Sequence, residues 1–392
     1  MTSVELPTGF STHVANVGIK DDTDDFVVIA SDRPCVAAAM FTRSRFAGPS
    51  VVVSRRHVED HQLRAVVVVS KNANVATGAL GLANAEELAA GVATAIGCAS
   101  TDVLVTSTGV IGRQYPMDRL RSHLASLRWP FDGADRRDAL AAATGMMTTD
   151  THPKTAVATL AADAGTATVV GMAKGVGMIE PDMATMLAFV LTDAAVDAAD
   201  LDRITRSVVA RTFNSLSVDT DTSTSDTAAV LANGAAGAVD LVEFEAAVES
   251  VCLELTRQLA RDGEGATKLL VVEVDGARDD DQAKRVAKTV LNSPLVKTAV
   301  HGADPNWGRV AMAVGKCSDD TDIDEGRVTI RFGGAEVYPT PIGDEELAEL
   351  EKYLTGDEVT IQVGLGIAQG AWTVYGCDLS DGYVRINADY TT

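Results

Sequence analysis

The sequence predicts a layered α/β or α+β fold, and three observations lead to that prediction. Short β-branched segments bounded by turn residues are interspersed with longer helical segments along the whole chain. No unit of 20–50 residues recurs, and no low-complexity linker divides the 392 residues. Hydrophobic residues make up 46% of the chain but aromatic residues only 5%, so the core must be built from Ala, Val and Leu. Paired strands with interspersed helices normally bury one layer against another.

The charge balance, the cysteine content and the apolar runs exclude several classes of partner and site. The chain has 55 acidic and 33 basic residues and a net charge of −22, which argues against nucleic acid, because phosphate binding needs a basic face. Its five cysteines are odd in number and far apart, so neither a disulfide framework nor a zinc site is predicted. The amino terminus lacks a signal pattern, and the apolar runs are too short to span a membrane. A cytoplasmic protein without membrane contact is expected.

Turn residues divide the chain into the following expected elements. The first half is expected to hold strands at 26–31, 35–41, 50–54, 64–70, 103–106, 155–160 and 166–173, and helices at 83–97, 116–126 and 135–146. The second half is expected to hold strands at 185–192, 228–232 and 269–274, and helices at 197–213, 240–261 and 280–291. Residues 292–309 are expected to form a loop, followed by short strands and one helix near 345–354.

The stretch 171–190 changes character in its middle. Gly175, Gly177 and Pro181 mark a turn-rich segment, and a continuous apolar run of strand length begins at Thr185. A hydroxyl at the start of a buried strand would be held on a rigid element, as a nucleophile requires. It is also where an ordinary strand would begin, and the local pattern alone favours that second interpretation.

Several common site motifs are excluded by their spacing. Gly175-x-Gly177 lacks the third glycine of a dinucleotide fingerprint, and no Gly-Lys-Ser/Thr closes a phosphate loop. Residues 320–324 look like a calcium loop, but Glu325 and Arg331 stand where its glycine and glutamate belong, so a solvated turn is expected. No His-x-x-x-His, His-Glu pair or Gly-x-Ser-x-Gly elbow occurs, so neither a metal site nor a Ser-His-Asp triad is predicted.

Because no histidine is placed to act as the base, the remaining possibility is an N-terminal nucleophile. Peptide cleavage turns an internal threonine into a chain start, and its own α-amine, with a pKa near ~7.7–8.0, becomes the base. The reaction needs donors for an oxyanion, which the Thr108 hydroxyl and the Gly109 amide could supply. It also needs a substrate pocket, where Glu264 offers a carboxylate for a cation. Taken singly, a strand-end turn and a solvated acid explain these residues better.

Taken together and in this order, these segments resemble the ornithine acetyltransferase family, also called bifunctional glutamate N-acetyltransferases. The resemblance covers essentially the whole chain and rests on eight blocks. They are Ser107–Gly112, Met147–Thr151, Lys174–Leu187, Asp221–Thr224, Asp262–Gly265, Ser293–Ala299, Asp304–Arg309 and Asn387–Thr392. The Met-Ala-Thr-Met-Leu and Asp-Pro-Asn-Trp-Gly-Arg sequences within them are specific, so finding both in order leaves little room for chance.

The resemblance implies an α/β sandwich akin to the N-terminal-nucleophile hydrolases. It implies that the precursor cuts itself between Ala184 and Thr185 into an α chain, 1–184, and a β chain, 185–392, which form one intertwined catalytic unit. Thr185 would then carry acetyl from N2-acetyl-L-ornithine to L-glutamate by ping-pong exchange, releasing ornithine. The family's assembly is α2β2 or larger, and neither a metal nor a bound cofactor is implied.

The resemblance also assigns roles at the site. Thr108 and Gly109 would form the oxyanion pair. The implied substrate contacts are Thr148, Lys174, Thr185, Glu264, Asn387 and Thr392. Glu264 would meet the side-chain ammonium of ornithine in a charge-assisted contact.

The chain departs from the usual family pattern in three segments, which are Val176–Asp182, Val218–Asp226 and Arg113–Pro116. These differences resemble the branch found in clavam antibiotic clusters of actinomycetes, so the setting is either arginine biosynthesis or its antibiotic-cluster counterpart. Three alternatives stay open. The enzyme could also use acetyl-CoA as donor, it could pass the acyl group to water as an aminopeptidase or amidohydrolase of the same fold, or the chain could be an uncleaved binding protein for basic amino acids.

Overall fold

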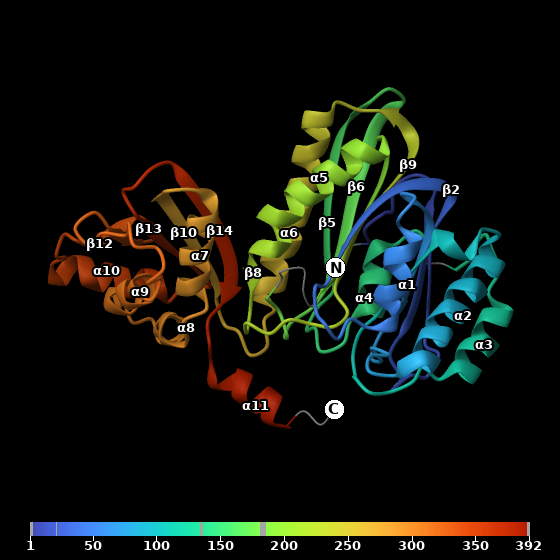
Figure 1. The fold of residues 1–392 in the computed structure, drawn as a ribbon, viewed down its shortest axis with the longest axis horizontal. Coiled ribbons are helices and arrows are strands. Elements are labelled where there is room, and N and C mark those ends of the chain that lie inside the picture. Colours follow the sequence, from blue (N-terminus) through green and yellow to red (C-terminus); the bar gives the residue numbers. More distant parts are fainter. Residues whose placement is uncertain (1–2, 21, 134–135, 181–185, 390–392) are drawn as a thin grey trace.

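The computed structural model describes residues 3–20, 22–133, 136–180 and 186–389, and within these ranges the chain forms two β-sheets with helices around them (Figure 1). The larger sheet contains β1 (Phe10–Ala15), β2 (Phe26–Phe41), β3 (Gln62–Val69), β4 (Val103–Ser107), β5 (Lys154–Ala162), β6 (Gly165–Lys174), β7 (Leu187–Ala195) and β9 (Thr227–Ala238). The smaller sheet contains β8 (Leu216–Ser217), β10 (Leu269–Ala277), β11 (Thr329–Phe332), β12 (Ala335–Tyr338), β13 (Glu358–Gly364) and β14 (Gly370–Cys377).

The helices are α1 (Pro49–His57), α2 (Gly78–Ile96), α3 (Met117–Ser126), α4 (Ala139–Met146), α5 (Ala198–Arg211), α6 (Leu241–Arg261), α7 (Asp280–Leu291), α8 (Pro294–His301), α9 (Trp307–Gly315), α10 (Asp344–Leu354) and α11 (Asp381–Asp389). Two short 3₁₀ turns, Ser100–Asp102 and Phe213–Ser215, complete the described elements. None of these helices is long and apolar enough to cross a bilayer.

Strand β7 lies in the interior of the larger sheet. The strand order is β4-β3-β2-β9-β7-β6-β5. β1 pairs with residues 26–31 of β2 and is antiparallel to them. β7 is antiparallel to β6 and parallel to β9, with Leu187 opposite Lys174 on one side and Thr227 on the other. Eight of its nine residues are buried, because helices cover both faces of the sheet. A strand that is buried on both faces reads as a continuous apolar run, as the sequence from Leu187 does.

Helix α6 packs between the two sheets and makes the molecule a layered sandwich. On one side it approaches β6 so closely that a side chain at Gly171 would collide with Val251 and Leu255. On the other side it meets alternate residues of β10, including Leu269 and Val271. The intervening residues of β10 belong to a separate core that includes α7, as the two-residue period of a strand requires. The expected layered α/β sandwich is therefore confirmed.

Helices cover both faces of the larger sheet. Along β2, Val28 packs in the core formed with α1, α2 and α3. Its neighbours Val27 and Ile29 point the other way, into the core that α4 covers. The two predicted strands 26–31 and 35–41 are one strand, interrupted by a bulge between Ala30 and Cys35.

The expected strand at 50–54 is wrong, because this segment belongs to α1. Pro49 occupies the first helical turn, where its missing N–H costs nothing. The alternating burial of Val51 and Val53 arises from packing of the helix on the sheet. The β-branched Val run misled the prediction, because tertiary packing overrode its strand propensity.

The expected loop at 292–309 is also wrong, because it contains α8 and the start of α9. Ser293 caps α8 by accepting the Val296 N–H, and Pro294 follows at the first position. Residues that were interpreted as loop formers therefore mark the start of a helix. α9 and α11 were not predicted. α11 lies apart from the rest of the smaller-sheet lobe, and the structure describes no buried residue in it (Figure 1).

Candidate active site

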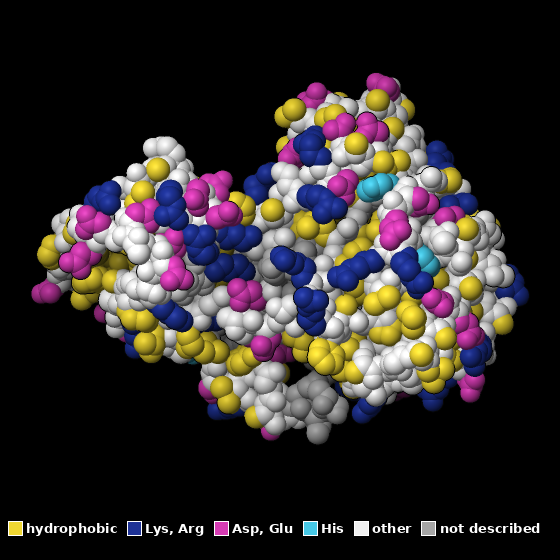
Figure 2. Space-filling view, in the orientation of Figure 1, with side chains coloured by type: hydrophobic (Ala, Val, Ile, Leu, Met, Phe, Trp, Pro, Cys, Tyr) yellow, Lys and Arg dark blue, Asp and Glu magenta, His cyan; other side chains and the backbone are white. Residues whose placement is uncertain are grey.

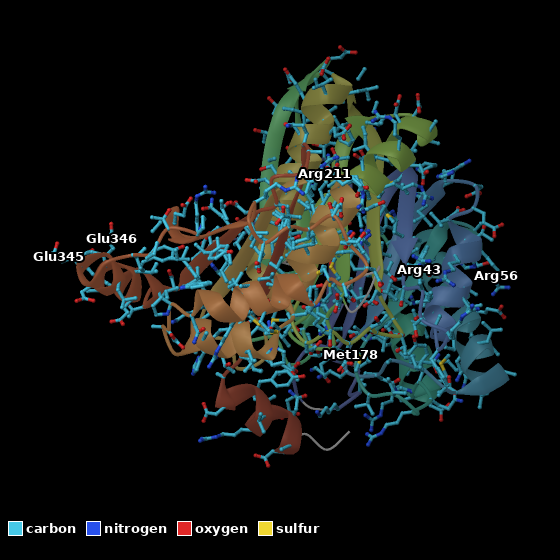
Figure 3. The ribbon with its side chains drawn as sticks, turned by 60° about the vertical axis from the view of Figure 1, so that its left-hand side comes forward. Arg43, Arg56, Met178, Arg211, Glu345 and Glu346 are labelled. Carbon is cyan, nitrogen blue, oxygen red and sulfur yellow. The ribbon has the colours of Figure 1, made fainter. Side chains whose placement is uncertain are left out.

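Six of the residues expected at the site line one cavity of about 610 Å³. They are Thr108, Gly109, Thr148, Lys174, Glu264 and Asn387. The other lining residues are Ala73, Val110, Ile111, Thr149, Gly177, Met178 and 223–225. In Figure 3, Met178 marks this region, between the lobe that carries Glu345 and Glu346 and the α1 side that carries Arg56. Segments from both halves of the sequence therefore meet at one hollow.

Thr108 and Gly109 follow the carboxyl end of β4. Gly109 has a φ of 125°, and a Cβ there would lie 2.3 Å from the Lys71 carbonyl carbon, so only glycine fits. Its N–H has no hydrogen-bond acceptor within the described part of the chain. The Thr108 hydroxyl accepts a hydrogen bond from Lys174 Nζ at 3.0 Å, which leaves its own hydrogen available. The amide and the hydroxyl can thus serve as two donors to a developing oxyanion.

Lys174 ends β6 and is almost fully buried, with 5% of its surface exposed. Burial lowers the pKa of Lys174, because a charged ammonium loses its hydration there, while the nearby Asp150 carboxylate acts in the opposite direction. This environment brings the lysine closer to its neutral form than a surface lysine. It also fixes the amine against the Thr108 hydroxyl.

Glu264 lies in the glycine loop after α6 and brings a carboxylate to the cavity. Its N–H donates to the Val176 carbonyl at 2.8 Å, which ties the loop to the segment after β6. Its carboxylate accepts from Asn387 Nδ2 at 2.9 Å and from the Thr149 hydroxyl at 3.4 Å. A Cβ at Gly177 would lie 2.5 Å from the carboxyl carbon, so glycine leaves room for the acid. The arrangement can accept a cationic group.

Ala184, Thr185 and Thr392 lie outside the described residues. The described chain resumes at Met186, immediately before β7, and the Met186 carbonyl accepts the Thr227 N–H at 3.0 Å. The backbone therefore enters the larger sheet at the residue that follows Thr185.

The segment that precedes the undescribed stretch is held by the second half of the chain. The Asp219 carboxylate accepts the N–H groups of Met178 and Ile179 at 2.6 and 2.8 Å. The Glu180 carboxylate accepts from Asn292 Nδ2, at 3.0 Å to each oxygen. Glu180 is one of the departures from the family pattern, and its side chain is anchored to the end of α7.

Asp226 was not predicted as a site residue. It immediately precedes β9, is 2% exposed, and neither of its carboxylate oxygens has a hydrogen-bond partner among the described residues. Burial raises the pKa of Asp226 well above its ordinary value, although the Met186 N–H and the Lys174 ammonium act to lower it. The Met186 N–H influences the carboxyl without meeting hydrogen-bond geometry. Such surroundings favour the neutral form of the acid.

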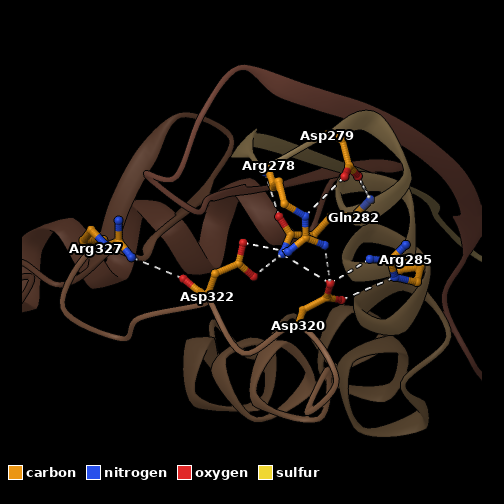
Figure 4. Close-up of polar contacts among 7 residues, drawn as sticks. All are labelled: Arg278, Asp279, Gln282, Arg285, Asp320, Asp322 and Arg327. Carbon is orange, nitrogen blue, oxygen red and sulfur yellow. Dashed lines mark hydrogen bonds and ion pairs between the residues drawn. The ribbon is translucent and has the colours of Figure 1, made fainter.

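The segment 320–324 forms a turn whose residues from 321 on are exposed or half-buried, as the sequence predicted, and Asp320 is the exception. Asp320 is buried and accepts from Arg285 at 2.7 Å, Arg278 at 3.1 Å and Gln282 at 3.3 Å (Figure 4). Hydrogen bonding from Arg285 holds the pKa of Asp320 below its ordinary value. Arginines therefore occupy the positions where a cation would bind. Among the described residues, no group of His, Cys, Asp and Glu could hold a metal ion.

Comparison with known proteins gives a family match over nearly the whole chain. The profile of the ArgJ family matches residues 11–392. A glutamate N-acetyltransferase of Streptomyces clavuligerus is 59% identical over 99% of this chain and 98% of its own length. An arginine biosynthesis bifunctional protein ArgJ of Nostoc sp. is 52% identical over the full length of both chains.

Two solved structures of related proteins each cover about half of the chain. A Bacillus halodurans ArgJ structure is 42% identical, with a TM-score of 0.49, and covers 53% of this chain and 100% of that chain. An ornithine acetyltransferase of Mycobacterium tuberculosis, solved with ornithine, is 32% identical with a TM-score of 0.40, and covers 47% of this chain and 95% of that one.

Proposed function

The chain belongs to the ArgJ family, and on this premise we propose that it moves an acetyl group from N2-acetyl-L-ornithine to L-glutamate. The S. clavuligerus relative is named for acetyl transfer to glutamate, and the Nostoc relative for arginine biosynthesis. One observation of this chain supports the proposal most strongly. Oxyanion donors, a buried lysine and an acid suited to a cationic substrate all line the same cavity.

In the first half-reaction, the Thr185 hydroxyl attacks the acetyl carbonyl of N2-acetylornithine. Its proton passes to the α-amine of Thr185, and the Thr108 hydroxyl and the Gly109 N–H stabilise the oxyanion. The C–N bond then breaks, the ornithine nitrogen takes the proton, and acetyl remains on Thr185. Glu264, steadied by Asn387, binds the side-chain ammonium of ornithine throughout.

In the second half-reaction, the α-amine of glutamate attacks the acetyl-Thr185 ester. The same donors stabilise the oxyanion, and the Thr185 α-amine takes the proton that the glutamate nitrogen loses. The C–O bond of the ester then breaks, and the threonine oxygen receives that proton. N-acetylglutamate leaves, and the enzyme is restored. Lys174 bonds the Thr108 hydroxyl, so it orients that hydroxyl in both halves of the reaction.

We further propose that the free α-amine of Thr185 arises by self-cleavage after Ala184. The chain before the cut is held at Met178, Ile179 and Glu180, which would limit its movement during attack. The resulting chains, 1–184 and 185–392, share the larger sheet, since β7 pairs with both β6 and β9. Following the family resemblance, the cleaved protein would assemble as α2β2 in the cytoplasm.

A denaturing gel with mass spectrometry tests the role of Thr185. The parent should run as two fragments divided at residue 184, and Thr185→Ala should remain one chain. Incubation with acetylornithine alone should add a single acetyl group, on Thr185. Cleavage of the Thr185→Ala variant, or acetyl on a different residue, would contradict the proposal.

One assay with several arms distinguishes the alternatives. Acetylornithine plus glutamate should yield N-acetylglutamate and ornithine in equal amounts. Free acetate in place of N-acetylglutamate would instead indicate a hydrolase. A parallel reaction with acetyl-CoA plus glutamate measures use of the second donor, and ornithine binding without turnover would indicate a binding protein.

A further inference from the structure

A buried cluster of three charged side chains lies beneath the cavity. Lys154, at the start of β5, donates to Asp150 Oδ1 at 2.8 Å and to Asp262 Oδ2 at 2.6 Å. Its third donor direction faces the His152 carbonyl at 3.4 Å. The side chains of Lys154 and Asp150 are 0% exposed and that of Asp262 is 3% exposed. The three protons of one ammonium are thus shared among three acceptors, two of which are buried carboxylates.

Asp150 fixes two segments that carry cavity residues. Its Oδ2 accepts the Thr148 N–H at 3.1 Å, and its Oδ1 accepts the Gly175 N–H at 2.6 Å, directly after Lys174. Burial by itself would raise the pKa of Asp150. The neighbouring Lys174 and Lys154 cations and the Gly175 N–H outweigh that effect and hold the pKa below its ordinary value. The acid is therefore ionised, and its backbone contacts are charge-assisted.

Asp262 fixes the third segment, because it lies two residues before Glu264. Its Oδ2 accepts the Thr151 N–H at 3.1 Å, and its Oδ1 accepts the Thr151 hydroxyl. Asp262 also ends α6, where its N–H bonds the Gln258 carbonyl at 3.1 Å. The loop that carries Glu264 is thereby tied to the segment that carries Thr148.

We propose that Lys154 is the positioning residue of this site, since one buried ammonium joins the two carboxylates that hold the backbones around Thr148, Lys174 and Glu264. None of the three charged groups lines the cavity, so they act through the residues they hold. The proposal rests on the proposed function, because it assigns Glu264 to substrate binding and Lys174 to orienting the Thr108 hydroxyl. It predicts that the two carboxylates control different kinetic constants.

The test compares Asp262→Asn with Asp150→Asn in the full-length protein. Asp262→Asn loosens the Glu264 loop and should raise KM for acetylornithine about tenfold, with kcat within roughly threefold of the parent. Asp150→Asn removes the acceptor arrangement at Gly175 and Thr148, and should lower kcat by about tenfold or more. Lys154→Met releases both segments and should change both constants. The asparagine variants keep the shape of the acids and cover the outcome in which Lys154→Met fails to fold.

Lys268→Met is the matched control. Lys268 is also nearly buried, and its ammonium likewise meets three acceptors, the carbonyls of Val300, His301 and Leu354. It lines no part of the cavity, so both constants should stay within about threefold of the parent. The same pattern of lower kcat and higher KM in both asparagine variants, or unchanged constants in both, would overturn the proposal. A parent that transfers no acetyl from acetylornithine would instead contradict the proposed function.

Discussion

Two of the charge clusters in the described part of the chain lie in opposite surroundings. The cluster of Asp150, Lys154 and Asp262 under the cavity is dry, with side chains at most 3% exposed. The cluster around Asp320 is wet at its cationic end, because Arg278 and Arg285 are 47% and 52% exposed (Figure 4). Figure 2 shows Lys and Arg side chains gathered on the surface where the part of the molecule built on the smaller sheet meets the part built on the larger sheet. Charge at this surface is hydrated, whereas charge under the cavity is not.

The difference indicates what each cluster does. Ions that leave water lose hydration energy, which mutual attraction offsets only when geometry and hydrogen bonding are nearly complete. The dry cluster meets that condition and joins three segments of the candidate site. Exposed ion pairs are worth about 0–1 kcal/mol each, so the wet cluster adds little stability, and it holds a loop that carries no residue of the candidate site. Four predictions test this contrast.

The largest effect is expected from removing the cation of the dry cluster. Lys154→Met leaves Asp262 buried without its ammonium partner and leaves Asp150 with Lys174 alone, and should lower the free energy of unfolding by about 3–5 kcal/mol. Urea unfolding in a Thr185→Ala background measures it, because the uncut chain unfolds as one molecule. A loss below about 1 kcal/mol would show that water reaches the cluster.

Asp226 differs from the acids of both clusters, because it is buried and has no hydrogen-bond partner in the described chain. Its pKa is raised by burial, so the folded state keeps a proton that the unfolded chain releases above its ordinary value of 3.8. Stability should therefore fall as pH rises from 3.8 to the raised pKa, by up to about 1.4 kcal/mol per pH unit. Asp226→Asn should make this slope shallower and stabilise the protein at pH 7. Urea unfolding at pH 4, 5.5 and 7 measures it, and a destabilised Asn variant at pH 7 would mean an ionised Asp226.

A smaller effect is expected from the wet cluster. Arg285→Met removes the shortest contact of Asp320, but Arg278 and Gln282 still donate to it. The free energy of unfolding should fall by no more than about 1 kcal/mol. Measured beside Lys154→Met under the same conditions, a loss of similar size would abolish the distinction between the clusters.

The smallest effect is expected from salt. At 1 M NaCl the screening length is about 3 Å, so the cost of Arg285→Met should shrink by a few tenths of a kcal/mol. The cost of Lys154→Met should not change measurably, because mobile ions do not enter a buried cluster. Unfolding curves at about 0.1 and 1 M NaCl provide the comparison.

The sequence allowed most elements and the candidate site residues to be predicted, but not the dry cluster. Local patterns alone favoured a strand-end turn at Thr108 and Gly109 and a solvated acid at Glu264, and only the family blocks, taken together and in order, indicated a site there. The pairing of Lys154 with Asp262 spans 108 residues, and no local pattern reveals it. Asp150 and Asp262 do lie within two of the family blocks, which was the available signal. The helix at 49–57 was missed for a related reason, since burial against the sheet outweighed its β-branched residues.

The interior position of β7 has a consequence for how the mature enzyme can be handled. Under the proposed cleavage, the chain that begins at Thr185 would supply β7 and β9, whereas β6 and β2 on either side come from the other chain. Neither chain could then complete the sheet by itself. Once denatured, the cleaved enzyme would recover by a second-order encounter of two fragments, so its refolding yield would depend on protein concentration. The uncut precursor would refold as a first-order process. Recovery after denaturation would therefore depend on whether the chain had been cut before it unfolded.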